Sequence, residues 1–573
     1  MLKPARRLRD HWFYGPVFQS SSIYVQVILA SVLINLFALA SSLYIMTVYD
    51  RVIPNNAIES LMALTSIIVV VIIFDFIMKI IRGNFVDRAS LKIDRRVSTN
   101  LFDKISRHDT TLGRNATGAL AATVRDFDLL KDVIGSATFT IFADLPFIAL
   151  FLVVLWLIGG PVAAVPAMIV PLVILFGLIL QPIIRRMTEI SMTQGKSKQA
   201  VMVEMIGALE TVKTTQGNSM LRNRWLNSVL NQGQTQAKTK LTSQLASHFA
   251  QFGQQASQVG IVVYGVFLIS AGDLTMGQLI ACVILSGRTM APLGQITGLL
   301  GRMNQAISAY RGLHEVLGTE TEEESRANFV NREVLKGQVE FKNVNFTYED
   351  QPEPVLHNIN FTIEEGDKVA ILGRIGSGKT SLLRLICGLH PPDTGVVLID
   401  NADIRQIRPR DVRANIGTVL QNPVLFSGTI RDNLLMGKPD ATDEELLYAA
   451  KASGADSFIG LLPGGFDFPL SERGQELSAG MRQTIAIARA LISKPNILLM
   501  DEPTASMDNA TEAQLVDRLQ KATKDKTAIF VTHRGAMLKM ANKVILMEKG
   551  RIMMAGPRDD VLAKLQGAAN DQG

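Results

Sequence analysis

Apolar positions gather into long runs in the first half of the chain, whereas the second half has only short ones. Six runs come close to the roughly 20 residues that a helix needs to cross a bilayer, at about 24–48, 61–82, 136–158, 161–183, 253–272 and 275–297. After Arg302, short β-rich runs alternate with helical segments, a pattern typical of an α/β domain. We therefore predict a membrane α-helical domain with six transmembrane helices, followed by an α/β domain.

The acidic, polar segment 319–328 (TETEEESRAN) is typical of a linker. We expect an N-terminal segment over residues 1–22, a transmembrane domain over 23–315, a linker over 316–335 and a further domain over 336–573. Two long connections rich in Lys and Arg, 82–131 and 185–240, follow spans two and four. Because cytoplasmic loops carry an excess of positive charge, these connections, both termini and the second domain are predicted to be cytoplasmic.

The composition narrows the class of protein. Of the 573 residues, 47% are apolar, which excludes a disordered chain, and only 19% are charged, which agrees with a part that lies in lipid. The net charge of +6 is modest for this length, so nucleic acid is not an expected partner. Cys282 and Cys387 stand alone, which argues against a disulfide framework or a zinc site.

Three charged residues interrupt the spans: Asp75, Asp144 and Arg288 lie in spans two, three and six. Intramembrane charges are costly, and they usually pair or face a water-filled cavity. One interpretation is structural pairing, of Asp75 with Lys79 or of Asp144 with Arg288. The other is a polar vestibule, open to the cytoplasm, that would suit a hydrophilic cargo.

Span five carries a polar stripe. Gln244, Gln251, Gln255 and Gln258 recur at spacings of seven, four and three, which places them on one helical face. Such a stripe either bonds to neighbouring helices or lines a path. Our hypothesis is a path whose amides hydrogen-bond an extended peptide backbone, since a cavity for lipid would be more apolar.

The strongest motif is GRIGSGKT at residues 373–380, between the apolar run KVAIL and the helical segment SLLRLICGLH. A Gly-rich loop in this context turns its backbone N–H groups around phosphates, beside the positive end of a helix. Lys379 is expected to reach the β and γ oxygens, and the Thr380 hydroxyl to bind Mg²⁺. The motif predicts a nucleotide site formed by Gly373, Arg374, Ile375, Gly376, Ser377, Gly378, Lys379, Thr380 and Ser381.

A second motif, ILLMDEP at residues 497–503, predicts a buried strand that ends at two carboxylates. Asp501 is placed to hold Mg²⁺ through water, and Glu502 to polarise the water that attacks the γ-phosphate. An Asp-Glu pair after a strand is also a common helix N-cap, but its pairing with GRIGSGKT favours a catalytic site. The cofactors that we expect are ATP and Mg²⁺.

Between the two motifs lies ELSAGMRQ, residues 476–483, which resembles the signature motif of ATP-binding cassette (ABC) proteins. The usual form of that motif is LSGGQ, so Ala479 and Met481 are departures. Ser478 and Gly480 are retained, and the resemblance implies that they contact the γ-phosphate. We expect the function of the motif to survive.

Other landmarks of the family follow in order. The resemblance implies that Tyr348 stacks on adenine, that Gln421 of the Q-loop senses Mg²⁺ and the attacking water, and that Asp508 belongs to the D-loop. His533 matches the switch histidine that contacts the γ-phosphate. The implied catalytic residues are Glu502, His533, Lys379 and Gln421, and the implied metal-site residues are Thr380, Gln421 and Asp501.

Six spans followed by one cassette look like an ABC exporter half-transporter. In this family the signature of one cassette closes over the phosphate loop of another, so the resemblance implies a homodimer with two ATP sites. Closure would be passed to the membrane through turns of the two long connections, near residues 115–127 and 205–218, which contact the Q-loop region in the family.

The segments 11–57 and 272–296 resemble those of bacterial type I secretion ATPases, above all exporters of RTX toxins and large adhesins. The resemblance implies export of an unfolded protein from the bacterial inner membrane, with a periplasmic adaptor protein and an outer-membrane channel as partners. Many relatives begin with a peptidase-like domain. Here about 22 residues precede the first span, so we expect no leader-peptide cleavage by this chain.

Three alternatives remain open. A lipid or drug exporter has the same architecture, although the charged residues and the glutamine stripe argue weakly against it. A peptide or bacteriocin exporter would more often carry the peptidase. A regulator with a silent ATPase is disfavoured because Lys379, Glu502 and His533 are all present.

Overall fold

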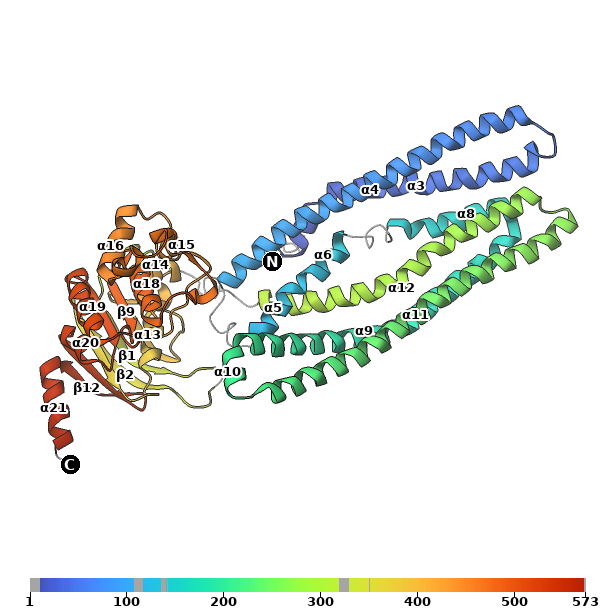
Figure 1. Cartoon of the computed structure of the whole chain (residues 1–573). Helices are drawn as coiled ribbons and strands as arrows, with labels where there is room; N and C mark the ends of the chain where they lie inside the picture. The colour runs from blue at the N-terminus through green and yellow to red at the C-terminus, as the bar shows by residue number, and fades with distance from the viewer. Residues whose placement is uncertain are drawn as a thin grey trace. The chain divides into compact units, whose positions relative to one another are not determined.

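The structure is a computed structural model that describes residues 11–107, 117–135, 141, 143–318, 329–349 and 351–570. The chain forms two compact units, one within residues 1–319 and one within residues 320–573 (Figure 1). The helical unit contains the predicted spans, and the second unit is an α/β domain that we call the cassette. Each is described by itself.

The helical unit is built from long helices joined by short turns. Its elements are α2 (Tyr14–Phe18), α3 (Ser21–Thr47), the π-helical turn η1 (Val48–Val52), α4 (Ile58–Ser106), α5 (Thr117–Arg125), α6 (Phe127–Gly135), α8 (Pro146–Gly159), η3 (Gly160–Ala163), α9 (Ala164–Gly207), α10 (Leu209–Thr214), α11 (Asn218–Ala271) and α12 (Met276–Gly318).

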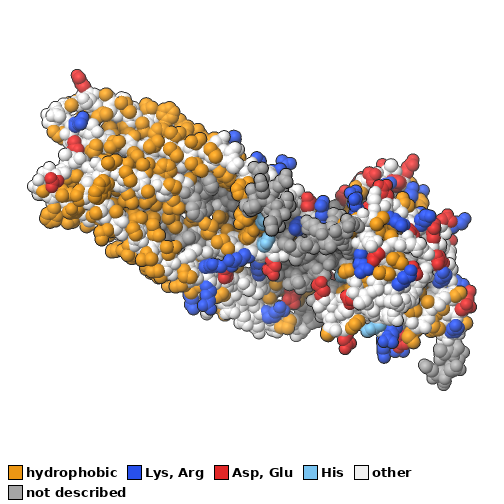
Figure 2. Space-filling view, turned by 180° about the vertical axis from the view of Figure 1, so that it is seen from behind, with side chains coloured by type: hydrophobic (Ala, Val, Ile, Leu, Met, Phe, Trp, Pro, Cys, Tyr) orange, Lys and Arg blue, Asp and Glu red, His pale blue; other side chains and the backbone are white. Residues whose placement is uncertain are grey.

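Five helical stretches in the described residues are long and apolar enough to cross a membrane. One of them, residues 146–207, contains α8, η3 and α9, and the chain reverses direction near Gly160, whose φ is +51° (Figure 1). It therefore holds the fourth predicted span and residues 146–158 of the third, of which residues 136–140 and 142 lie outside the described residues. Hydrophobic side chains cover the middle of this unit (Figure 2), as a lipid environment favours.

Small residues let α11 pack closely against α9 and α12. A Cβ atom at Gly253 would lie 2.9 Å from Val173 Cγ2 of α9, and one at Gly265 would lie 2.4 Å from Leu279 Cδ1 of α12. The buried hydroxyls of Ser257 on α11 and Ser286 on α12 share a hydrogen bond of 2.8 Å. Because lipid supplies no hydrophobic force between helices, such close contacts hold the bundle together.

Two of the three intramembrane charges, Asp75 and Asp144, form ion pairs in the described residues, and one of these pairs is as predicted. Asp75 Oδ2 lies 2.6 Å from Lys79 Nζ, which confirms that interpretation. Asp144 pairs with Arg82 of α4, at 3.1 Å, and not with Arg288. The predicted Asp144–Arg288 pair is therefore wrong, because the packing of α4 brings Arg82 to this carboxylate, whereas Arg288 is exposed on α12.

The turn between α11 and α12 is tied to the end of α3. Asp50 lies in η1, and its carboxylate accepts hydrogen bonds from the Thr275 hydroxyl, at 2.7 Å, and from the Gly277 backbone N–H, at 2.8 Å. A Cβ atom at Gly277 would lie 2.5 Å from the Met46 carbonyl oxygen. The absence of a side chain at Gly277 thus permits the contact.

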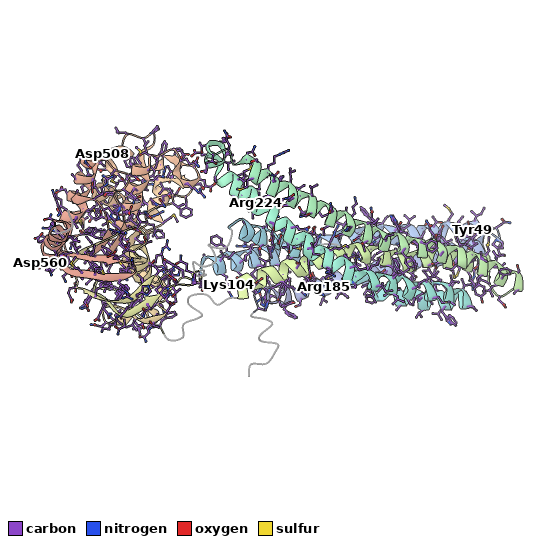
Figure 3. The ribbon with its side chains drawn as sticks, turned by 90° about the horizontal axis from the view of Figure 1, so that it is seen from below. Tyr49, Lys104, Arg185, Arg224, Asp508 and Asp560 are labelled. Carbon is purple, nitrogen blue, oxygen red and sulfur yellow. The ribbon has the colours of Figure 1, made fainter. Side chains whose placement is uncertain are left out.

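The two ends of the helical unit differ in charge. Figure 3 shows Tyr49 at the end that carries the Asp50 contact, and Lys104 and Arg224 toward the opposite end. The basic end is the one that the charge distribution of the sequence predicts to be cytoplasmic.

The cassette is built on a six-stranded sheet with the strand order β12-β11-β3-β10-β9-β6, in which β12 alone is antiparallel to its neighbour. A four-stranded antiparallel sheet has the order β2-β1-β4-β5, and β7 pairs with β8. The strands are β1 (Val339–Phe346), β2 (Leu356–Ile363), β3 (Lys368–Gly373), β4 (Thr394–Ile399), β5 (Ala402–Asp403), β6 (Ile416–Val419), β7 (Gly428–Thr429), β8 (Pro469–Leu470), β9 (Ile497–Asp501), β10 (Thr527–Val531), β11 (Lys543–Glu548) and β12 (Arg551–Pro557).

Helices cover these sheets. They are α13 (Lys379–Ile386), α14 (Pro409–Asn415), α15 (Ile430–Leu435), α16 (Asp443–Ser453), α17 (Asp456–Ile459), α18 (Ala479–Leu491), α19 (Asn509–Ala522), α20 (Gly535–Met540) and α21 (Arg558–Asn570), with short 3-10 turns at Ile404–Gln406, Gly465–Asp467 and Glu472–Gly474. All residues of β9 and β10 are buried, as expected for strands covered on both faces. Parallel strands align their carboxyl ends at one edge, where ligands bind in such sheets.

The cassette packing extends into the segment that the sequence assigned to a linker. Leu335 is fully buried in the cassette core, and Val330 forms a bridge with Ile407. Residues 319–328 of that segment lie outside the described residues.

Candidate nucleotide site

The phosphate loop joins β3 to α13 at the carboxyl edge of the six-stranded sheet. Gly378 caps the helix with φ +94°, and a Cβ atom there would lie 2.6 Å from Leu356 Cδ2. Only glycine fits this backbone and this space without strain. The sequence therefore turns the chain sharply and aims the first N–H groups of α13 into the loop.

Lys379 and Thr380 begin α13 and lie against the loop and the adjacent strand. The Lys379 ammonium donates to the carbonyl oxygens of Gly373, at 2.8 Å, and Arg374, at 2.9 Å. Burial lowers the pKa of Lys379, while the nearby Glu502 and Asp501 act in the opposite direction. A partly desolvated ammonium inside a ring of carbonyls and amides interacts strongly with an anion.

Two carboxylates lie near the start of α13: that of Asp501, the last residue of β9, and that of Glu502, the next residue. The Thr380 hydroxyl donates to Asp501 Oδ2 at 2.7 Å, so the two proposed metal-site residues are in contact. Burial raises the pKa of Asp501, Thr380 lowers it through this hydrogen bond, and the charge of Glu502 raises it; the net change is upward. A bound cation would counter that shift, because a positive charge favours the ionised carboxylate.

Glu502 is the meeting point of the predicted catalytic groups. Gln421 Nε2 donates to Glu502 Oε2 at 3.3 Å, and His533 Nε2 lies 3.8 Å from Glu502 Oε1. These side chains come from the segments that follow β9, β6 and β10, three neighbouring strands in the sheet. The parallel sheet thus brings together residues that are far apart in the sequence.

The backbone of Glu502 has φ +48°, in the left-handed region. Residues other than glycine and asparagine adopt this backbone conformation at a cost in free energy. Its backbone N–H donates to the Val531 carbonyl oxygen at 3.0 Å, which holds the residue against β10. The left-handed turn directs the chain away from β9 directly after the buried Asp501.

Tyr348 borders the phosphate loop. Its hydroxyl lies 3.0 Å from the Ser381 hydroxyl and accepts a hydrogen bond from Arg384 at 3.1 Å. The ring also makes an edge contact with His390. The sequence did not single out Arg384, and the available signal was weak: a basic residue one turn after Thr380 on α13.

The signature residues lie at another place in the cassette. Ser478 caps α18 and accepts from the Met481 backbone N–H, and Asp508 caps α19 and accepts from the N–H groups of Ala510 and Thr511. Ser478, Gly480 and Asp508 line one cavity, which is also lined by Ser453, Gly454, Ser457, Phe458, Thr511, Gln514, Leu515 and Arg518. The phosphate loop, 373–380, is at the end of β3, so one chain presents its loop and its signature at separate sites.

The Ser377 hydroxyl indicates whether the loop fits a phosphate. Ser377 is 3% exposed, and in the described part of the chain its Oγ has no hydrogen-bond partner. Buried hydroxyls rarely go unpaired, so this atom fits a ligand oxygen. The described residues hold no group of three His, Cys, Asp or Glu side chains that could bind a metal by itself. One carboxylate and one hydroxyl suit Mg²⁺, which usually takes further ligands from phosphates and water.

Family models match both units: "ABC transporter transmembrane region" over residues 24–293 and "ABC transporter" over residues 356–505. The chain is 30% identical over 560 residues to the exotoxin translocation ATP-binding protein PaxB of Pasteurella aerogenes, covering 97% of this chain and 78% of that protein. The chain belongs to the ABC transporter family. The transporter is likewise 30% identical over 557 residues to the toxin RTX-I translocation ATP-binding protein of Actinobacillus pleuropneumoniae, with the same coverage.

A solved structure of a bacterial Atm1-family ABC exporter with ATP bound superposes on the transporter with a TM-score of 0.87. The two chains are 23% identical and cover 95% and 96% of each other, so this likeness shows the fold. The transporter is an ABC exporter half-transporter embedded in a membrane, with an ATPase domain that couples ATP hydrolysis to transport. Exporters of this family function as dimers.

Proposed function

We propose that the transporter exports an unfolded protein across the bacterial inner membrane, as the ABC component of a type I secretion system. The observation that carries the proposal is the similarity along 97% of the chain to proteins named for toxin translocation. A periplasmic adaptor protein and an outer-membrane channel would be its partners, and both termini and the cassette would lie in the cytoplasm. No observation favours lipid, drug or peptide export over this function.

The geometry of the cassette supports a role for each residue at the phosphate loop. Lys379 and the backbone N–H groups of the loop would bind the phosphates, and Thr380 and Asp501 would hold Mg²⁺, which supplies charge neutralisation at the phosphates when bound. Tyr348 would stack on the adenine. The Ser377 hydroxyl would gain the partner that it lacks in the described structure.

The hydrolysis roles centre on Glu502. Its carboxylate would polarise the attacking water, and Gln421, which donates to it at 3.3 Å, would help to orient that water. His533, 3.8 Å from the same carboxylate, would contact the γ-phosphate. Ser478 and Gly480 of a second copy would close the site in a homodimer. The closing motion would reach the membrane through the turns near 115–127 and 205–218, of which 115–116 lie outside the described residues.

Glu502→Gln tests both the chemistry and the cargo. Loss of the carboxylate removes a general base, and such groups contribute about 10²–10⁴-fold to rate, so ATP binding should persist while phosphate release falls by that order. The exposed Glu444 of α16 offers a matched control, Glu444→Gln, which should hydrolyse ATP normally. A Glu502→Gln protein with wild-type turnover would remove Glu502 from its role.

The culture medium of cells with each variant then identifies the transported class. One or a few large proteins should be present with the wild type and with Glu444→Gln, and absent with Glu502→Gln. If the medium is unchanged while phosphate release falls, protein secretion is the wrong function, and membrane lipids become the next candidate cargo.

A further inference from the structure

The glutamine face of α11 is exposed in the helical unit. Gln244, Gln251 and Gln255 are exposed and Gln258 is partly exposed. At about 100° per residue these four side chains fall within an arc of about 60° around the helix. We call them the amide arc.

The amide arc is separate from the two other faces of α11. Ala250, Gly253 and Ser257 are buried, and they form the face that packs on α9 and α12. A third face exposes large apolar side chains, including Phe252, at 65%, and Val259, at 64%. The helix therefore presents one face to the bundle, one apolar face suited to lipid, and one row of carboxamides.

The position of the arc argues against lipid as its neighbour. Gln255 and Gln258 fall within predicted span five, where an amide without a partner is costly in hydrocarbon. In the described residues, no hydrogen bond joins either of these two carboxamides to another group. Gln251 is the exception within the arc, since its Oε1 lies 3.3 Å from His248 Nδ1 one turn earlier.

The polar surface continues toward α12. Gln258 Nε2 lies 3.6 Å from the place where a Cβ atom of Gly287 would be, so the two helices meet beside this amide. The next residue, Arg288, is exposed although it lies within predicted span six. A guanidinium at this depth faces a water-filled or protein-filled space, which indicates that the arc does as well.

We propose that the amide arc binds the extended backbone of the exported polypeptide by hydrogen bonding, an inference that rests on the proposed function. A carboxamide carries the same donor and acceptor groups as a peptide unit. It therefore recognises a feature that every protein segment shares, whatever its side chains. Four neutral amides also bind acidic and basic segments without a charge preference.

The spacing of the arc favours sliding over tight binding. Its glutamines are separated along the helix axis by about 4.5, 6 and 10.5 Å, at 1.5 Å per residue. Backbone groups on one side of an extended chain repeat about every 6.6–6.8 Å. Because these repeats do not match, the arc favours no single register of the bound chain, and a moving chain meets no single deep minimum.

Site-specific cross-linking tests what occupies the arc. A photoreactive amino acid replaces Gln255 in full-length transporter that also carries Glu502→Gln, in intact cells, and the matched control places it at Phe252 on the apolar face. The proposal expects an adduct at 255, but not at 252, with the same protein that Glu502→Gln removes from the culture medium. An adduct at 255 with lipid or with a second copy of the transporter would overturn the proposal.

Substitution tests what the arc does. The triple variant Q251L/Q255L/Q258L keeps similar volumes without amides, and Q251N/Q255N/Q258N keeps amides on shorter side chains. Secretion should fall at least tenfold with the leucines and recover in large part with the asparagines, at equal membrane levels of the transporter. Wild-type secretion with the leucines would overturn the proposal. If the wild type itself secretes no protein, the proposed function fails first, and the two failures are thus distinguishable.

Discussion

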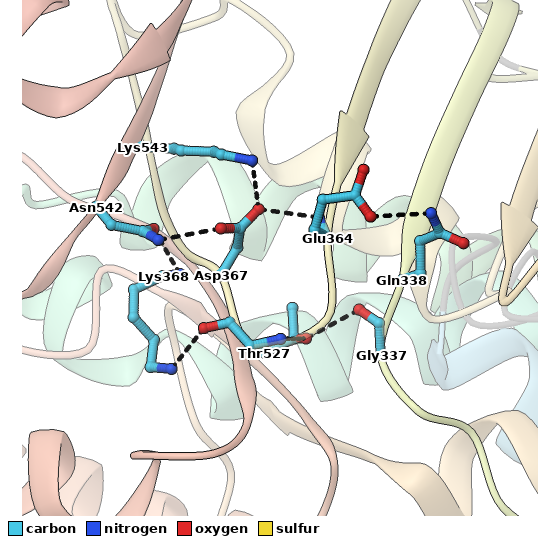
Figure 4. A network of polar contacts seen from close by, with 9 residues as sticks. Gly337, Gln338, Glu364, Asp367, Lys368, Thr527, Asn542 and Lys543 are labelled. Carbon is cyan, nitrogen blue, oxygen red and sulfur yellow. Dashed lines mark hydrogen bonds and ion pairs between the residues drawn. The ribbon is translucent and has the colours of Figure 1, made fainter.

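Asp367 directly precedes β3, at the end opposite the phosphate loop. Its side chain joins its own turn to the start of β11 (Figure 4). Its carboxylate accepts hydrogen bonds from Lys543 Nζ at 2.6 Å, from the Glu364 backbone N–H at 2.9 Å and from Asn542 Nδ2 at 3.0 Å. Burial alone would raise the pKa of Asp367, but these hydrogen bonds outweigh it and lower the pKa below the ordinary value. The buried carboxylate is therefore held in its ionised form.

Asp367→Asn should destabilise the cassette by about 1.5–3 kcal/mol at pH 7, the range for hydrogen bonds to charged groups. Since the folded pKa is the lower one, the stabilisation is present above the unfolded value near 3.9 and is lost as the pH falls through the folded value. Hydrogen exchange of β3 and β11 amides in the full-length protein measures it: the variant should exchange faster at pH 7, with a smaller difference below about pH 4. The exposed Glu365→Gln is the control, and equal protection of Asp367→Asn at pH 7 would contradict the prediction.

For single residues, the sequence predicted which side chains form the nucleotide site better than it predicted which side chains they contact. The contacts of Thr380 with Asp501 and of Gln421 with Glu502 join residues whose motifs the sequence displays. Arg384 has no motif, because its partner, the Tyr348 hydroxyl, comes close only after β1 and α13 pack together.

Helix positions followed from apolar length, but helix contacts did not. Five predicted spans lie on long helices, and residues 146–158 of the third lie in α8, because crossing a bilayer requires one apolar run. The ion-pair partner of Asp144 depends on which helices pack side by side, and that is not a local property of the sequence. Here α4 is the neighbour and provides Arg82. Hydrophobic periodicity carries no information about such pairs.

Gly277 of α12 packs against Met46 and Asp50 at the end of α3, a contact that we call the tip contact. Even a methyl group at position 277 should therefore lower the stability of the helical unit. Gly277→Ala would place a Cβ atom 2.5 Å from the Met46 carbonyl oxygen and 2.6 Å from Asp50 Oδ1. Overpacking of this kind costs about 1–3 kcal/mol. Thermal unfolding followed by tryptophan fluorescence should show a lower midpoint, since Trp12, Trp156 and Trp225 all lie in the helical unit.

Gly301→Ala is the matched control on the same helix. Among the described residues, a Cβ atom at Gly301 would meet nothing within 4 Å, and alanine is favoured over glycine in a helix by about 1 kcal/mol. This variant should therefore be as stable as the wild type or more so. Equal midpoints for Gly277→Ala and Gly301→Ala would show that the tip contact has room for a methyl group.

Each chain carries one phosphate loop and one signature cavity at separate places, and this predicts complementation between chains. Lys379→Ala disables the loop and Ser478→Arg disables the signature, so either homodimer should be inactive. In a mixed dimer, the intact loop of one chain meets the intact signature of the other. Random pairing makes half of the dimers mixed, each with one intact site, so phosphate release should return to about a quarter of the wild-type level.

Co-expression of the two variants gives this value for the whole pool of dimers. Different affinity tags and sequential purification then isolate the mixed dimers alone, which should release phosphate at about half of the wild-type level. Each variant expressed alone is the control. Mixed dimers without hydrolysis would have one of two explanations: both sites must be intact in one dimer, or each site lies within one chain. A chain with both changes, paired with a wild-type chain, separates them. That dimer is inactive if both sites must be intact, and active if each site lies within one chain.

The left-handed backbone at Glu502 places folding and chemistry in conflict at one position. Glycine or asparagine would adopt φ +48° with less strain, but neither offers a carboxylate at the length that reaches toward Gln421 and His533. With the catalytic role proposed for Glu502, stability is traded for activity at this position, as happens at many functional sites. A selection for heat-resistant cassettes would therefore be drawn toward replacements at 502, and the most robust proteins that it returned would be the ones that no longer turn over ATP.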